Sequence, residues 1–324
     1  MLADFEEVQG IDKLKIIKFK GLSDLAELEF SLMNVIVSPG NFGKTTLLMA
    51  VAMATDFNKQ NRVVRVAEAF RGRNEKLFEK ILHILYDKDG EFIYELQSEF
   101  GGFILHKSLI GIFSKNKFCG EYFSHLKNEE LCIDNNYKAD LTVSRGAKEI
   151  DSKNGIAGYD FAYFDFSGEY RYKILEYKND VMRKIIEDYI LSFEDFVDEI
   201  YIKNGKHYIK HLKLGECTAE ILGSSLVKCL EFSDFCDKNQ KKVLLIDNLD
   251  SNVSPDVYRI FIKMLLAHLV NTGSQFFVTA KDRKFGELLI EEVKSADLYR
   301  YTSFIDIYRD DNGIGIKNIL GKDF

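Results

Sequence analysis

Residues 34–57 constrain the fold of this chain more than any other part. Residues 34–37 (NVIV) are a short, mostly apolar run that predicts a β-strand. A loop with two glycines follows, and then a run rich in Ala, Met and Leu that extends to about residue 57 and predicts a helix. A strand, a Gly-containing loop and an apolar helix in direct succession predict an α/β unit.

The loop between this strand and this helix is close to the P-loop pattern GxxxxGK[ST]. Gly43, Lys44 and Thr45 match the end of the pattern, whereas Ser38 stands in place of its first glycine. Such a loop turns backbone N–H groups toward phosphates at the positive end of the following helix. Gly40 supplies further backbone freedom.

The residues that would hold a nucleotide follow from this pattern. Lys44 is expected to contact the β- and γ-phosphates, and the Thr45 hydroxyl is expected to hold Mg²⁺. Asn41 is among the few non-glycine residue types that tolerate a left-handed backbone. The alternative is a turn that reads GKT by chance. The candidate loop comprises Ser38, Pro39, Gly40, Asn41, Phe42, Gly43, Lys44, Thr45 and Thr46.

A second candidate lies far along the chain, where residues 243–246 (VLLI) form an apolar run that ends at Asp247. A buried strand that presents a carboxylate at its end is how P-loop enzymes build the acidic ligand of Mg²⁺. We therefore predict Thr45 and Asp247 as the metal ligands. Asn248 follows, and its amide can position water but cannot accept a proton. Asp250 could replace a missing base only if the loop bends it back.

Composition and charge exclude several other classes of protein. The chain has 324 residues, 46% of them hydrophobic, and a net charge of −7, which excludes a disordered chain and nucleic-acid binding through bulk positive charge. The five cysteines form no CxxC pair, and we expect reduced thiols in an intracellular protein. The N-terminus has no apolar signal segment, and no apolar run is long enough to span a membrane. We expect a cytoplasmic protein with no membrane contact.

Periodicity and turn residues predict the remaining elements. We expect short antiparallel strands and loops over residues 100–170, a long amphipathic helix or two helices over 173–200, and a helix over 216–236. An Asn-Gly pair at 204–205 and the residues 311–313 predict two hairpins. A helix over about 255–270 and a strand over 275–279 complete the C-terminal part.

Taken together, these segments resemble the ABC-type ATPase heads of the RecF/SMC/OLD-like group. The opening strands and the loop at 38–46 are similar to the start of such heads. Residues 222–228 (LGSSLVK) resemble the Ser/Gly signature, with Ser224 standing 23 residues before Asp247. Residues 246–255 (IDNLDSNVSP) resemble the Asp-Glu segment, and the strand that precedes Lys281 resembles the one that ends in the switch histidine.

The resemblance implies a fold and a division of the chain. The fold is an α/β P-loop NTPase of ABC-ATPase type, with a mixed central sheet flanked by helices, an antiparallel β subdomain and a helical insertion. Residues 1–324 would form a single head. An inserted β/helical subdomain at about 87–215 would separate a P-loop lobe (1–86) from a lobe (216–324) that carries the signature and Asp247.

The sequence departs from the family at the positions that serve hydrolysis. Asn248 replaces the expected catalytic Glu, Lys281 replaces the switch His, Ser38 replaces a P-loop Gly and Ser225 replaces a signature Gly. Lys281 could still contact a γ-phosphate as a point charge. Gln97 is the candidate for the γ-phosphate-sensing Gln, against the alternative of a strand-surface residue.

The resemblance therefore implies an ATP- and Mg²⁺-binding head, a slow ATPase, that forms a homodimer around ATP with Ser224 reaching the partner's nucleotide. It would regulate a separate effector protein, in antiphage (antiviral) defence or in a DNA-maintenance system. One alternative is a RecF-like DNA-binding repair ATPase, and another is a nucleotide-bound scaffold without turnover. Residues 59–80 hold seven basic and three acidic side chains and could contact DNA or an acidic partner, although a solvated face is the favoured interpretation.

Overall fold

The computed structural model describes residues 10–23, 25–38, 43–55, 62–70, 92–98, 101–107, 117–124, 127–134, 159–167, 197–203, 206–218, 224–251, 253, 258–310 and 313–321. Pro39, Gly40, Asn41 and Phe42 of the candidate loop lie outside these ranges, as do most of the expected helix over 173–200 and the Gly223 before Ser224.

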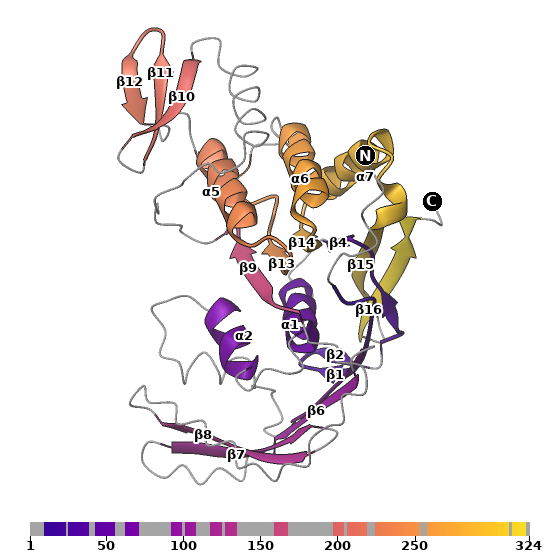
Figure 1. Ribbon diagram of the computed structural model, residues 1–324. Helices are drawn as coiled ribbons and strands as arrows, with labels where there is room; N and C mark the ends of the chain where they lie inside the picture. Colours follow the sequence, from indigo (N-terminus) through magenta and orange to yellow (C-terminus); the bar gives the residue numbers. More distant parts are fainter. Residues whose placement is uncertain are drawn as a thin grey trace.

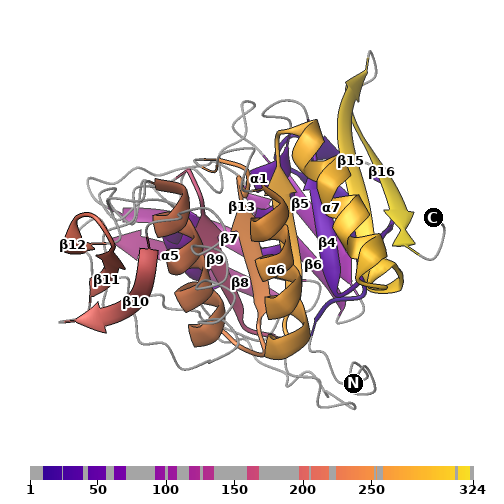
Figure 2. The ribbon, with the colours of Figure 1, turned by 90° about the horizontal axis from the view of Figure 1, so that it is seen from above.

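A six-stranded sheet forms the centre of the molecule (Figure 1, Figure 2). Five of its strands are parallel, and the strand at one edge is antiparallel to its neighbour. The sheet is therefore mixed, and its flanking helices make the fold α/β, as expected. In spatial order the strands are β16 (Gly313–Leu320), β15 (Thr302–Asp310), β4 (Met33–Val37), β14 (Gln275–Ala280), β13 (Val243–Asp247) and β9 (Phe161–Asp165).

Helices α5, α6 and α7 cover one face of this sheet (Figure 2). Leu244 and Ile246 of β13 pack against this layer, together with Phe276 and Val278 of β14. Gly286 of α7 allows a close approach to the sheet, because a Cβ there would lie 3.3 Å from a methyl group of Val37. The helices are α5 (Ser224–Lys238), α6 (Tyr258–Thr272) and α7 (Arg283–Ser295), and the short 3₁₀ helix η4 (Tyr299–Tyr301) follows α7.

Helix α1 (Lys44–Thr55) lies on the opposite face, beside α2 (Arg62–Phe70). Every residue of α1 from Leu47 to Thr55 is buried. A helix without a polar face needs cover on both sides, and α1 contacts β13 and β14 of the central sheet as well as β1 and β5 of a second sheet. The apolar composition of this segment thus follows from its place between two sheets.

The second sheet is antiparallel and has five strands. The hairpin of β7 and β8 lies beyond β6, and a separate three-stranded sheet projects past α5 (Figure 1). These strands are β1 (Lys13–Phe19), β2 (Leu22–Ser23), β3 (Leu28–Glu29), β5 (Phe92–Ser98), β6 (Gly101–Lys107), β7 (Lys117–Ser124), β8 (Lys127–Asp134), β10 (Val197–Lys203), β11 (Lys206–His211) and β12 (Gly215–Thr218).

Three expectations about elements were wrong. Residues 161–165 were expected among antiparallel strands, but β9 is parallel to β13 and belongs to the central sheet. The helix expected over 216–236 begins only at Ser224, because residues 215–218 pair with β11 as a strand. The helix expected over 173–200 cannot extend to its end, because β10 begins at Val197. For β9, pairing with a distant strand overrides the local pattern, whereas for β10 and β12 the partner is the adjacent strand β11.

The segment 87–215, which was expected to be an insertion, contributes β9 to the central sheet and β5 to the second sheet. Within the described ranges no helix is long and apolar enough to cross a bilayer. Cys217, Cys229 and Cys236 are free thiols, and the side chains of Cys119 and Cys132 lie outside the described part.

Candidate functional site

Lys44, Thr45 and Asp247 lie where the parallel strands of the central sheet end, at its carboxyl edge. Strand β4 ends at Val37, and Gly43 directly precedes α1, which begins at Lys44. Strand β13 ends at Asp247 beside the end of β14. In open α/β sheets this edge is where ligands bind, because the following loops and helix N-termini gather there.

Gly43 sets the entry into α1. Its φ is +73°, in the left-handed region that favours glycine. A Cβ at this position would lie 3.1 Å from Cδ2 of Leu22. Its carbonyl oxygen accepts the first helical hydrogen bond, from the backbone N–H of Leu47 at 2.7 Å. The glycine is therefore required both by the turn and by close packing against β2.

Lys44 is buried, with 4% of its surface exposed. Its ammonium group donates a hydrogen bond to the carbonyl oxygen of Ser38 at 2.8 Å and so closes the loop. Burial lowers the pKa of Lys44, and the positive charge of Lys281 lowers it further, while Asp247 and Asp250 act in the opposite direction. A buried ammonium group close to a second cation favours an anionic ligand.

Asp247 is 2% exposed and accepts hydrogen bonds from several sides. Its Oδ2 accepts from the Thr45 hydroxyl at 2.6 Å and from the Tyr163 hydroxyl at 3.3 Å. Its Oδ1 accepts from the Thr279 hydroxyl and from the backbone N–H of Asn248. Burial raises the pKa of Asp247, and the negative charge of Asp165 adds to this, whereas the bonds from Thr279 and Thr45 lower it.

The oxygen atoms of this site suit a hard divalent cation. Thr45 and Asp247 bring a hydroxyl and a carboxylate together. No group of three or more His, Cys, Asp or Glu side chains in the described ranges could hold a metal by itself. Mg²⁺ commonly binds through one or two carboxylates plus phosphate and water oxygens, so the residues present fit Mg²⁺ held jointly with a phosphate.

Asn248 connects the ends of three strands. Its φ is +54°, a left-handed value that asparagine tolerates. Its backbone N–H donates to the Thr279 hydroxyl at 2.8 Å, and its side-chain amide donates to Oδ1 of Asp165 at 3.1 Å. The amide at this position therefore fixes the end of β13 to β14 and β9.

Asp250 anchors the loop that follows β14. Its Oδ2 accepts from the backbone N–H groups of Lys281, at 2.8 Å, and of Asp282. That oxygen is engaged with the backbone at the start of α7. The other oxygen, Oδ1, is buried without a hydrogen-bond partner in the described ranges. The side chain of Lys281 is exposed.

Two other candidates, Gln97 and Ser224, belong to a strand of the second sheet and to the start of α5. Gln97 belongs to β5, where its backbone is paired with Lys15 in the second sheet. Ser224 is the first residue of α5. The side chains of both lie outside the described part. Thr46 follows Thr45 in the first turn of α1.

The basic segment 59–80 is described only over residues 62–70. Arg65 is engaged within the fold: it forms an ion pair with Asp160, and its guanidinium lies 5.3 Å from the ring centroid of Phe161. At least this cation of the segment serves packing between α2 and β9.

Sequence reasoning missed three residues that the fold brings to Asp247. Thr279 and Tyr163 bond to its carboxylate, and Asp165 lies beside it on β9. One signal was available, because residues 161–165 (FAYFD) resemble residues 243–247 (VLLID) in ending an apolar strand with an aspartate. Nothing in the sequence indicated that the two strands are neighbours.

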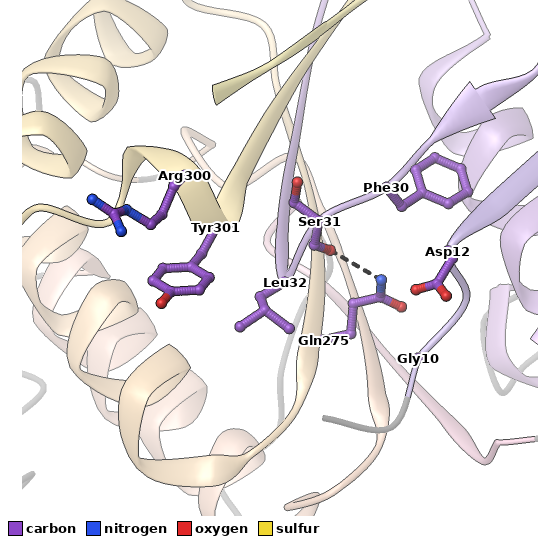
Figure 3. Close-up of a pocket in the computed structure, with 8 residues that line it drawn as sticks. All are labelled: Gly10, Asp12, Phe30, Ser31, Leu32, Gln275, Arg300 and Tyr301. Atoms are coloured by element: carbon purple, nitrogen blue, oxygen red, sulfur yellow. Dashed lines mark hydrogen bonds between the residues drawn. The ribbon is translucent and has the colours of Figure 1, made fainter. Parts of the chain in front are cut away.

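A pocket of the described part lies at the opposite edge of the sheet (Figure 3). Its floor includes Leu32, which precedes β4, and Gln275, which opens β14. The amide of Gln275 is already bonded to the backbone of Ile11 and to the carbonyl oxygen of Ser31. The pocket is thus separate from Lys44 and Asp247. It is lined by Gly10, Asp12, Phe30, Ser31, Leu32, Gln275, Arg300 and Tyr301.

No family model matches the sequence, and no curated protein matches it. Three solved structures are similar to the chain in outline. The SMC head domain from Thermotoga maritima is 13% identical, with 96% of this chain and 99% of that chain covered and a TM-score of 0.44. An SmcHead bound to the C-winged helix domain of ScpA is 11% identical, with 96% and 98% covered and a TM-score of 0.48. An Smc head domain with an extended coiled coil, bound to the C-terminal domain of ScpA derived from Pyrococcus furiosus, is 10% identical, with 97% of each chain covered and a TM-score of 0.45. Likeness of this degree does not assign the chain to a family.

Proposed function

We propose that this chain is a nucleotide-binding head of ABC type that binds ATP together with Mg²⁺. The observation that carries the proposal is the 2.6 Å hydrogen bond between Thr45 and Asp247 beside the buried Lys44. Thr45 and Asp247 are far apart in the sequence, and both were predicted as metal ligands. This hydrogen bond brings them into contact. Residues 1–324 are proposed as a single head, in which the segment 87–215 adds β9 to the sheet formed by 1–86 and 216–324.

Each residue has a distinct task in this proposal. The backbone N–H groups of the loop 38–46 and the N-terminus of α1 hold the phosphates. Lys44 binds the β- and γ-phosphates, whose negative charge offsets the cost of burying its ammonium group. Thr45 and Asp247 hold the cation, and bound Mg²⁺ supplies neutralisation of phosphate charge.

We propose that turnover is slow. Asn248 stands where a carboxylate would accept the proton of the attacking water, and an amide cannot do so. Lys281 stands in place of the switch His, and its exposed side chain supplies a point charge in place of an imidazole. The chain thus keeps the groups that bind a nucleotide while it lacks two that the resemblance associates with hydrolysis. A scaffold without turnover is the limiting case.

The assembly in which the head acts is also a proposal. We propose a homodimer with ATP between two heads, in which Ser224 at the start of α5 reaches the partner's nucleotide, and a separate effector protein that the dimer controls. A role in antiphage defence follows only from the resemblance. DNA is less favoured, because the net charge is −7 and Arg65 of the basic segment is engaged with Asp160.

The proposal is tested on the purified full chain. ATP is expected to double the mass measured by light scattering, and slow phosphate release is expected from the wild type. Lys44→Ala is expected to abolish both effects, whereas Lys263→Ala, which removes an exposed lysine of α6, leaves them intact.

Salt-sensitive DNA binding that requires ATP would instead favour the repair ATPase. Affinity purification with and without ATP then identifies the effector.

A further inference from the structure

Asp165 and Asp247 lie side by side on one face of the sheet. The two residues are paired in register between the parallel strands β9 and β13, so their side chains leave the sheet on the same side. Leu245 and Phe161 on that side pack in the same cluster as α1, which places both aspartates on the face where Lys44 and Thr45 begin the helix. The fold therefore brings a second carboxylate to the candidate site.

The environment of the two carboxylates differs. Asp247 is 2% exposed and accepts hydrogen bonds on both oxygens, whereas Asp165 is only partly buried. Oδ1 of Asp165 accepts from the Asn248 amide at 3.1 Å and from Ser167, through its backbone N–H at 2.8 Å and its hydroxyl at 2.7 Å. Within the described ranges no residue donates to Oδ2. One oxygen is thus fixed in direction while the other is open to a water molecule.

We propose that Asp165 is the catalytic residue that orients the attacking water and accepts its proton, with Asn248 and Ser167 as positioning residues. This inference rests on the proposed function of the site. The water oxygen forms a bond to the γ-phosphorus of ATP, and the bond between that phosphorus and the β–γ bridging oxygen breaks. The products are ADP and inorganic phosphate, and the proton passes to Oδ2 of Asp165 and from there to solvent.

The other candidates for this task are engaged elsewhere. Asp247 is committed to Thr45, Thr279 and the cation that the site would hold. The Oδ2 of Asp250 accepts two backbone N–H groups at the start of α7. Asn248 has no proton-accepting group, but it donates to Asp165. The asparagine thus has a use at this position, because it directs a carboxylate supplied by the neighbouring strand.

Asp165→Asn in the full chain separates the chemistry from the geometry. The amide oxygen of the new side chain can still accept from Asn248 and Ser167, while the negative charge and the ability to take a proton are removed. We expect kcat for ATP hydrolysis to fall by at least about 100-fold, while the Kd of ATP in the presence of Mg²⁺ stays within about threefold. Asp198→Asn is the matched control, because Asp198 is an exposed aspartate of β10 in the outlying sheet.

A second variant tests the positioning role. Asn248→Gly keeps the left-handed backbone at φ +54° and deletes the amide that directs Asp165. We expect a fall in kcat of about tenfold with little change in KM, since the carboxylate is retained but less well oriented. Asp165→Glu retains a carboxylate and is expected to keep more activity than Asp165→Asn.

The outcomes distinguish this inference from the proposed function. If the wild type and Asp165→Asn bind ATP and hydrolyse it at equal rates, the inference is overturned and the nucleotide-binding function stands. If the wild type binds ATP without any turnover, the catalytic role of Asp165 is likewise overturned. If the wild type fails to bind ATP at all, the proposed function fails with it. Loss of turnover in Asp165→Asn with retained binding supports the inference.

Discussion

At the residue scale, Asp247 shows how the candidate site depends on contacts that no local pattern contains. Its carboxylate accepts from Thr45 on α1, Thr279 on β14 and Tyr163 on β9. The sequence predicted Thr45 and Asp247, because each closes a recognisable motif. It did not predict Thr279, Tyr163 or Asp165, because their roles arise only when β14 and β9 lie beside β13.

The glycine that opens α1 gives a prediction about stability. Gly43→Ala is expected to cost about 1–2 kcal/mol for the left-handed backbone, plus a further cost for the 3.1 Å contact with Leu22. Gly273→Ala is the matched control, since Gly273 has a φ of +60° and no heavy atom of the described residues lies within 4 Å of the added Cβ. Urea unfolding of both variants measures the difference. Equal losses would contradict the account of the close contact.

At the element scale, the sequence predicted strands that are marked by an apolar run or by a turn motif. It did not predict strands that form only because they pair with a neighbouring strand. Strand β13 is a fully buried apolar run, which is typical of a parallel strand with helices on both faces. The hairpin between β10 and β11 was predicted from Asn-Gly. Strand β12 was mistaken for the start of a helix, because only its register with β11 makes residues 215–218 a strand.

Strand β14 also holds the segment before β1 through one side chain. The Gln275 amide donates to the carbonyl oxygens of Ile11 and Ser31 and accepts from the N–H of Ile11, and this residue is 3% exposed. Gln275→Ala leaves buried backbone groups without partners, so we expect a loss of about 2–3 kcal/mol in the free energy of unfolding. Gln240→Ala, at an exposed position, is expected to change it by less than about 0.5 kcal/mol. A loss no larger for Gln275→Ala than for Gln240→Ala would show that these bonds do not stabilise the fold.

At the scale of the whole molecule, the central sheet carries the site at its carboxyl edge and has a layer of helices on each face. Helix α1 lies between two sheets, and α5, α6 and α7 cover the other face of the central sheet (Figure 2). The strand, loop and helix at 34–57 predicted an α/β unit, and the resemblance to ABC-type ATPase heads implied the mixed sheet. It could not give the strand order β16-β15-β4-β14-β13-β9, since that order depends on contacts between distant segments.

The helical layer contains a histidine that makes stability depend on pH. His268 of α6 is fully buried, neither ring nitrogen has a hydrogen-bond partner in the described ranges, and its ring packs edge-on against Phe232 at 5.8 Å. Burial lowers the pKa of His268 to about 3. The unfolded chain, with a pKa near 6.5, therefore binds a proton that the folded chain excludes. The contribution of neutral His268 to the free energy of unfolding is fully present above about pH 6.5 and is lost as the pH falls toward 3.

His268→Leu removes this titration and places an apolar side chain of similar size in the same position. Between pH 7 and pH 5 the free energy of unfolding of the wild type is expected to fall by about 2 kcal/mol more than that of the variant. Urea titrations of both proteins at the two pH values measure this difference. Parallel pH dependence in the two proteins would show that His268 does not make this contribution.

The binding of ATP in the presence of Mg²⁺ to the full chain, measured by titration calorimetry, tests the central proposal most directly. The geometry of Lys44, Thr45 and Asp247 predicts saturable binding that weakens when Mg²⁺ is withheld. Lys44→Ala is expected to weaken binding by at least about tenfold, since it removes a buried charge from the phosphates, while Lys263→Ala leaves it unchanged. Absence of binding to the wild type, or equal binding by wild type and Lys44→Ala, would contradict the proposal.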